Sequence, residues 1–391
     1  MEIFHNPRID FLGKKWIFVS LSLLAVAVSL FLLSTRGLQY GIDFRGGADV
    51  VLRFAQPPGI DEIRGILAER GLDGAQIQTL GRVQEGAVAD ILIRVPPPQN
   101  GSAEAVLEEG DISSRVLQAL RSGLPGAPPP GKLDLNIAGE SELERALQAA
   151  VPGSEATAAT AARALTEYRN AHGGLFRDIE EARQVPGVTP EIASWLRDNA
   201  VVGGFAIRSV DYVGPSVGRE LKSKATWAVI FSLIAMLLYI VLRFNRFAFG
   251  ISAVLTLAHD AIVALGAVSL TGKEFDLTVL AAVLTIVGYS VNDTIVIFDR
   301  VRENLRHRKG DDLEKLFNDS INQTLGRTVL TSFLVLMVVV TLWLFGGSRL
   351  NPFSFTLLVG VICGSYSTIY VSSPIVIWWE MLMKGRGRRK A

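Results

Sequence analysis

Six long apolar stretches constrain the fold of this chain more than any other feature of its sequence. Two of them, residues 247–270 and 275–298, contain internal acids. The other four carry no formal charge over eighteen or more residues: 16–35, 225–242, 328–348 and 350–379. Because a helix needs about 20 apolar residues to cross a bilayer, the sequence predicts six membrane-spanning helices.

The composition agrees with a membrane protein and excludes several other classes. Hydrophobic residues make up 49% of the chain and charged residues 20%, which is too apolar for a disordered protein or an ordinary soluble enzyme. The single cysteine, Cys363, excludes an intramolecular disulfide framework and a cysteine-rich metal site. The first span is long and is followed by no small-residue cleavage site, so it is read as a signal anchor.

Lys and Arg are distributed unevenly among the segments that connect the spans. Seventeen of them lie at the N-terminus, in the turn between the second and third spans, between the fourth and fifth spans, and in the tail. The turns on the other side contain only Lys273 and Arg349. The positive-inside rule therefore predicts that both termini are cytoplasmic. The block 36–224, with 25 acidic and 20 basic residues, is then predicted to lie outside the cytoplasmic membrane.

The external block alternates between strand and helix patterns. Segments 60–70 and 111–120 have helical spacing, and four short segments read as strands: 48–54, 75–80, 88–95 and 204–213. This βαββαβ order is typical of a ferredoxin-like sandwich. The predicted fold class is a multi-span α-helical membrane protein with an external α+β domain of ferredoxin-like type.

A helical insert delays the last strand of that domain. After a Pro/Gly-rich linker at 124–131, segments 150–173 and 184–200 each contain Val-Pro-Gly, a short turn and a helix, like a tandem helix-hairpin-helix module. DNA-binding hairpins use a Gly-x-Gly turn, but both turns here lack the second glycine, and Glu155 adds a repelling charge. Since the insert also has no basic cluster, we expect no nucleic-acid partner and predict a structural or protein-docking role.

Two acids lie where the bilayer is expected. Asp260 is near the middle of the third span, and Asp293 lies in the fourth span toward its cytoplasmic end. An ionised carboxylate at this depth costs several kcal/mol unless it is paired or hydrated, and such acids commonly serve proton pathways. The alternative is that each acid is held by polar neighbours. The neighbours in the sequence are His259 beside Asp260, and Ser290, Asn292 and Thr294 beside Asp293.

Arg327 opens the fifth span and is a candidate charge partner for Asp293 if the two helices pack together. Gly360 and Gly364 form a GxxxG match, which predicts close packing of the sixth span. No nucleotide motif is present, since residues 266–274 depart from a P-loop in glycine spacing and in Glu274. We therefore expect no enzymatic activity and no cofactor, with work driven by an ion gradient.

Several motifs together resemble the SecF family, the smaller partner in the SecDF protein-export complex of the RND superfamily. The most specific is VGYSVNDTIVIFDRVREN at 287–304. The others are YGIDFRGG at 40–47, VGPSVG at 213–218, QTLGRTVL at 323–330 and LFGG at 344–347. The resemblance covers residues 1–123 and 204–391, and the helical insert departs from it.

The resemblance implies roles for individual residues and a set of partners. Asp293 is implied to take part in proton passage, with Arg327 as its charge partner and Asp260 as a polar position of the third span. Protons are implied as the coupling ion. The implied partners are SecD, the SecYEG channel, YajC, the exported preprotein and the lipid bilayer of the bacterial cytoplasmic membrane.

The motif at 40–47 contributes four further candidates, Gly41, Asp43, Gly46 and Gly47. The pair Gly46–Gly47 is interpreted as shaping the turn into the first external strand. Asp43 is interpreted as a local cap or a local ion-pair member, which is worth little at a surface.

The predicted organisation has eight segments. They are the cytoplasmic N-terminus 1–15, the first span 16–35, the periplasmic ferredoxin-like domain 36–123 and 204–224, the linker and insert 124–203, spans two to four at 225–299, a cytoplasmic segment 300–326, spans five and six at 327–380, and a basic cytoplasmic tail 381–391. Two alternatives stay open, a membrane-anchored binding module that uses the insert, and half of a small-molecule RND-type transporter. A passive anchor has no need for acids at bilayer depth.

Overall fold

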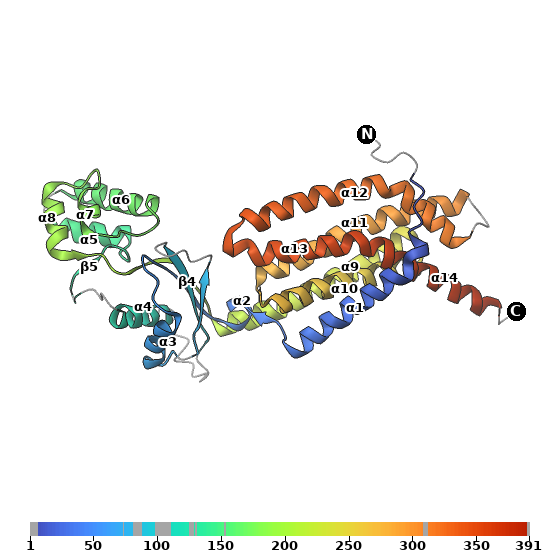
Figure 1. Ribbon diagram of the computed structural model, residues 1–391, viewed down its shortest axis with the longest axis horizontal. Helices are drawn as coiled ribbons and strands as arrows, with labels where there is room; N and C mark the ends of the chain where they lie inside the picture. The colour runs from blue at the N-terminus through green and yellow to red at the C-terminus, as the bar shows by residue number, and fades with distance from the viewer. Residues whose placement is uncertain are drawn as a thin grey trace. The chain divides into compact units, whose positions relative to one another are not determined.

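The chain divides into two compact units in a computed structural model. The structure describes residues 7–72, 74–80, 88–97, 111–124, 129, 131–151, 154–307 and 312–388. One unit is Arg45–Arg219, and the other joins Met1–Phe44 to Glu220–Ala391. Figure 1 shows the helices of the second unit and the mixed strands and helices of the first.

Long apolar helices make up the second unit. They are α1 (Lys15–Thr35), α9 (Pro215–Phe244), α10 (Phe247–Thr271), α11 (Leu277–His307), α12 (Leu313–Phe345) and α13 (Gly347–Ser367), which continues through a π-helix, η3 (Thr368–Ser372), into α14 (Ser373–Arg388). Six helices in the described part of the chain are long and apolar enough to cross a membrane, which confirms the six predicted spans. The described chain is therefore a multi-pass membrane protein.

Three of the spans form the interior of this bundle. About half of each apolar window is buried for α10 (50%), α11 (50%) and the span through α13 (56%), against 11%, 6% and 11% for α1, α9 and α12. Helices α10, α11 and α13 all pack against one another and lie side by side in Figure 1. Polar side chains on these three helices are thus the ones removed from lipid.

Small residues allow the interior helices to approach closely. A Cβ atom placed on Gly360 of α13 would lie 2.2 Å from Cδ1 of Ile286 on α11, and one on Gly364 would lie 3.3 Å from Cβ of Ser290. Close backbone approach of this kind is how small residues stabilise helix pairs in lipid. The close packing predicted from the GxxxG match is confirmed.

The segment after α1 is tied to the start of α11. Strand β1 (Gln39–Tyr40) pairs in parallel with β8 (Glu274–Phe275), and the short helix α2 (Ile42–Arg45) follows. The Asp43 carboxylate accepts a hydrogen bond from the backbone N–H of Leu277 at 2.9 Å. The interpretation of Asp43 as a local cap was therefore wrong: it caps a helix 234 residues further along the chain. Asp276 caps the same helix from the preceding position, accepting from Val279 N–H at 2.8 Å.

The other unit contains the predicted βαββαβ domain. Its elements are β2 (Gly47–Phe54), α3 (Ile60–Glu69), β3 (Gln76–Leu80), β4 (Ala89–Val95), α4 (Asp111–Gly123) and β7 (Phe205–Val213). The four strands form an antiparallel sheet in the order β3-β4-β2-β7, which is the ferredoxin-like order and confirms the predicted fold class. Alternate residues of β2 and β4 are buried beneath α3 and α4, as expected for a sheet with one covered face.

The insert forms two helix hairpins with a core of their own. Helices α5 (Glu140–Ala150) and α6 (Glu155–Ala171) make the first hairpin, and α7 (Ile179–Arg183) and α8 (Pro190–Asn199) make the second. A short parallel pair, β5 (Leu133–Asp134) with β6 (Ala200–Val201), brings the entry and exit of the insert together. Most of the predicted linker 124–131 and the first Val-Pro-Gly turn lie outside the described residues.

Candidate functional site

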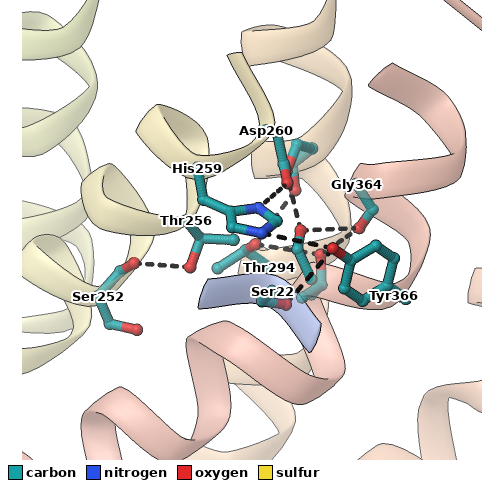
Figure 2. A network of polar contacts seen from close by, with 11 residues as sticks. Ser22, Ser252, Thr256, His259, Asp260, Thr294, Gly364 and Tyr366 are labelled. Carbon is teal, nitrogen blue, oxygen red and sulfur yellow. Dashed lines mark hydrogen bonds and ion pairs between the residues drawn. The ribbon is translucent and has the colours of Figure 1, made fainter. Parts of the chain in front are cut away.

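Asp260 is the centre of a polar network inside the bundle, drawn in Figure 2. It is fully buried on α10. One carboxylate oxygen lies 2.9 Å from Nδ1 of His259. The other accepts hydrogen bonds from Ser290 of α11 at 2.6 Å and Ser367 of α13 at 2.9 Å. All three interior helices therefore contribute a group to one carboxylate.

Helical spacing on α10 explains why these polar groups share a face. Ser252, Thr256, His259 and Asp260 recur at intervals of three and four residues, and all four are buried. Ser252 donates to the backbone carbonyl of Ser372 in the π-helix at 2.6 Å, while Thr256 donates back to its own helix. The polar stripe of α10 thus faces the sixth span rather than lipid.

Asp293 lies on α11 and is also buried, with 2% of its surface exposed. Its partner is Ser332 of α12, whose hydroxyl lies 3.5 Å from a carboxylate oxygen, which is long for a hydrogen bond. Tyr289 donates to the same serine at 2.8 Å. Asp293 is therefore held less firmly than Asp260.

The expected ion pair between Asp293 and Arg327 is not present in this structure. The guanidinium forms no salt bridge with the Asp293 carboxylate within 4.0 Å, although its charge acts on that carboxylate at longer range. Arg327 lies on an exposed face of α12, whereas Ser332, five residues further along, faces Asp293. The difference has a physical reason: Arg327 lies in the middle of α12, where the apolar part of the helix begins, and an arginine there keeps its charged head hydrated by turning outward.

The remaining polar candidates do not all contact the acid nearest to them in the sequence. Ser290 lies three residues before Asp293 but donates to Asp260. Thr294 donates to the Ser290 carbonyl at 3.1 Å, so it supports that serine. Asn292 lies on an exposed face of α11. His259 contacts Asp260 directly, as its position in the sequence predicts.

The motif at 40–47 does not form a single site. Gly41 donates its N–H to the Phe275 carbonyl at 3.0 Å, and with Asp43 it belongs to the helical unit. Gly46 and Gly47 belong to the other unit and have φ of 78° and 121°. A Cβ on Gly47 would lie 2.5 Å from the Val95 carbonyl oxygen. Only glycine fits such a position, which is what the turn interpretation requires.

Several polar residues of the two networks were missed from the sequence, and five of them contact an acid or link to its partners. Tyr366 and Ser367 lie on α13, Ser22 on α1, Tyr289 on α11 and Ser332 on α12. The sequence shows these residues as hydroxyl side chains within otherwise apolar spans. Serine and threonine are frequent in such spans, where they bond to their own helices, so a hydroxyl alone did not mark a functional position. Within the described residues, no group of three or more His, Cys, Asp or Glu is arranged to hold a metal ion.

Comparison with known proteins identifies the family. Residues 196–382 match the family described as protein export membrane protein SecD/SecF, C-terminal, and residues 31–58 match the SecD/SecF GG motif. The protein translocase subunit SecF of Koribacter versatilis is 36% identical over 99% of this chain and 95% of its own length. The chain belongs to the SecF family. The Pseudomonas aeruginosa SecF is 32% identical over 95% of this chain and 92% of its own.

Solved SecDF structures share the fold of this SecF-family chain. SecDF from a Thermus species, described as a translocon-associated membrane protein, matches with a TM-score of 0.64 and 29% identity over 96% of this chain. A super-membrane-facing form of SecDF matches with a TM-score of 0.58 and 28% identity over 99% of this chain. The chain spans about two fifths of these SecDF chains, 39% and 41%. The match supports an RND-like arrangement of the spans.

Proposed function

We propose that this SecF-family chain is an accessory subunit of the bacterial Sec protein translocase, which uses the proton-motive force to promote export and release of preproteins. Its SecF relatives are named translocase subunits, and the solved SecDF chains are more than twice its length. A SecD partner would supply the remainder. The SecYEG channel, YajC and the exported preprotein complete the proposed set of partners.

The proposed setting is the cytoplasmic membrane, with both termini inside. The termini and connecting segments on one side of the spans contain 17 Lys and Arg, and the turns on the other side contain two, which supports this orientation. It directs the unit Arg45–Arg219 to the periplasm, where an emerging preprotein is held or released. Work then comes from an ion gradient rather than from a nucleotide, and the protein is not an enzyme.

The observation that carries the proposal is the pair of buried carboxylates on adjacent interior helices. Asp260 and Asp293 are 0% and 2% exposed in a bundle whose other buried residues are mostly apolar. Moving one elementary charge across 100 mV is worth about 2.3 kcal/mol, enough to shift an equilibrium between two helix arrangements. Protonation of Asp293 neutralises the carboxylate and adds an O–H donor, so the long contact with Ser332 of α12 is the first to change.

The proposal is tested by replacing Asp293 with Asn, which keeps the shape of the side chain and removes its proton-binding site. Export of a secreted precursor is measured in membrane vesicles with and without a proton-motive force. We expect the force-dependent part of export to fall at least about tenfold, with the remainder unchanged, because loss of a proton-transferring group has at least this effect.

Asp276→Asn is the matched control, because it makes the same change on the same helix. Asp276 caps the first turn of α11, and an asparagine retains this capping ability. Accumulation of both variants and their association with a SecD partner are checked first. Full force dependence in Asp293→Asn would show that the acid is only a structural polar group and would reject the proposal.

A further inference from the structure

The tripeptide Ser365-Tyr366-Ser367 of α13 touches the networks of both buried acids. Ser367 donates to Asp260 at 2.9 Å, and Ser365 lies 3.5 Å from the hydroxyl of Tyr289, which bonds to the serine that contacts Asp293. Tyr366 lies between these two serines in sequence. Its hydroxyl lies 3.3 Å from Nε2 of His259.

Tyr366 also connects the network to α1. The Ser22 hydroxyl, on a residue that is only 3% exposed, lies 3.4 Å from the Tyr366 hydroxyl. Figure 2 shows Ser22 and Tyr366 approaching from their two helices, with the His259 ring between Tyr366 and Asp260. A continuous chain of polar groups therefore runs from α1 across α13 to the acid on α10.

The chemistry of the groups gives this row of hydrogen bonds a direction. Asp260 in its ionised form accepts only, so Nδ1 of His259 must carry the hydrogen. In the neutral ring Nε2 is then an acceptor, and the Tyr366 hydroxyl donates to it. The tyrosine oxygen is left to accept from Ser22. Each donor in the chain points toward the carboxylate.

We propose that Tyr366 is a proton-relay residue that links Asp260 to the α1 side of the bundle; this inference rests on the proton-driven function proposed above. Proton delivery follows the hydrogen bonds. Nδ1–H of His259 passes its proton to Asp260, Nε2 takes the Tyr366 proton, and the tyrosine oxygen takes one from the Ser22 side. The carboxylate gains one proton, Ser22 gives one up and recovers it from a hydronium ion, which leaves as water, and no net charge is left on the serine, the tyrosine or the histidine.

The surroundings of Tyr366 fit a relay better than a packing role. Tyr366 is half-buried, whereas Ser22, His259 and Asp260 are buried, so Tyr366 is the most accessible of the four groups in the path. Gly364, two residues before Tyr366, lets the sixth span pack closely against the acid, since a Cβ there would lie 3.6 Å from Asp260 Oδ2. The hydroxyl of Tyr366 makes both polar connections, and its ring also meets the His259 ring edge to face, with the centroids 6.0 Å apart.

The experiment uses Tyr366→Phe in the complete complex, reconstituted in vesicles with a pH-sensitive dye inside. This change removes one hydroxyl and keeps the ring. Proton flux driven by an imposed gradient is expected to fall at least about tenfold, since a missing proton carrier has at least this effect. Tyr370→Phe is the matched control, because Tyr370 lies one turn further along the sixth span and its ring stacks on Phe18. Its flux should equal that of the unmodified complex.

A double variant separates a relay from a packing contribution. In the Asp260→Asn background, Tyr366→Phe should cause no further loss of flux, because both changes interrupt the same path. A further loss of the same size would overturn the relay, and so would an unchanged flux in Tyr366→Phe alone. If the variant fails to accumulate, Ser22→Ala replaces it, with the same expected loss and the same overturning result.

The outcome also distinguishes this inference from the proposed function. If Asp293→Asn abolishes flux while Tyr366→Phe leaves it intact, the proton-driven function stands and only the relay is rejected. If Asp293→Asn leaves flux intact, the proposed function itself fails, whatever the tyrosine variant does.

Discussion

Three buried acids among the residues that the structure describes differ in the groups that hold them. Asp134 of the insert accepts backbone N–H bonds from Asn136 and Gly203, both at 3.0 Å. Asp260 is held by hydroxyls and an imidazole, and Asp293 by a long contact with the Ser332 hydroxyl and by the nearby Thr331 hydroxyl. Backbone donors are fixed by the fold, whereas hydroxyls rotate. We therefore assign Asp134 to the architecture of the insert, and the two membrane acids to a process in which donors rearrange.

Variants of Asp134 test this assignment at the level of one residue. Asp134→Ala leaves two buried N–H groups without an acceptor, so it should destabilise the insert by about 2–5 kcal/mol. Asp134→Asn keeps an acceptor oxygen and should cost less than about 1 kcal/mol. Hydrogen exchange of the α5–α8 amides, measured in the full chain, reports both values. Equal protection in the two variants would contradict the assignment.

The pH dependence of the insert follows from the same residue. Burial raises the pKa of Asp134 above its ordinary value, although hydrogen bonds from Asn136 and Gly203 oppose the shift. The folded insert then binds this proton more tightly than the unfolded chain. The stability contributed by the group is therefore fully present below its ordinary pKa of about 4 and is lost as the pH rises through the raised value.

Exchange measurements at two pH values check this sign. Relative to Asp134→Asn, the unmodified insert should gain protection as the pH falls from 7 toward the ordinary pKa of about 4, after correction for intrinsic exchange rates. A relative loss of protection on acidification would mean that the pKa is lowered rather than raised.

At the scale of elements, α13 is the helix on which the bundle depends. It packs against α10, α11 and α12, and it carries the serines and the tyrosine that join the two polar networks. A π-helix, η3, follows directly and accepts the Ser252 hydrogen bond. Single π-turns are frequent at functional sites, because the extra residue lets a helix shift without losing its backbone bonds. The tight contact at Gly360 holds the interior of this helix against α11.

Gly360→Ala tests the contribution of that contact. The added methyl would lie 2.2 Å from Cδ1 of Ile286 and should destabilise the bundle by about 1–3 kcal/mol. Thermal unfolding in detergent measures the loss, and Ile286→Ala in the same chain should recover part of it. Gly288→Ala, on α11, is the matched control, since no atom lies within 4 Å of its added Cβ. If both alanines behave alike, the close contact has no energetic role.

On the scale of the whole molecule, the insert and the ferredoxin-like sheet have separate cores. Leu143, Leu165 and Ile192 belong to the first core, and Val50 and Ile91 to the second. The ends of the insert meet at the β5–β6 pair, where Gly203 donates to Asp134. A module with adjacent ends and its own core can be removed with little effect on its host.

Removal of residues 134–203 with a short flexible joint should therefore leave the four-stranded sheet folded. We expect unchanged hydrogen-exchange protection of β2 and β4 and normal accumulation of the chain. The composition of the purified complex and the rate of export then address the predicted docking role. Loss of a co-purifying protein would support docking, whereas unchanged composition and export would remove the case for it.

The sequence by itself determined the order of the elements in this protein. Six spans and the βαββαβ pattern depend on runs and alternations among near neighbours, which are visible along the chain. Asp260 and Asp293 were recognisable for the same reason, because a charge stands out in an apolar run. The family motifs could also be read directly.

Only the tertiary structure decided which groups meet. Successive residues of a helix point about 100° apart, so neighbours in sequence face different partners. Ser290 therefore serves Asp260 rather than Asp293, Arg327 turns outward, and Asp43 caps α11 from 234 residues away. The chain from Ser22 through Tyr366 to Asp260 depends on the packing of α1, α10 and α13, which no local pattern of the sequence specifies.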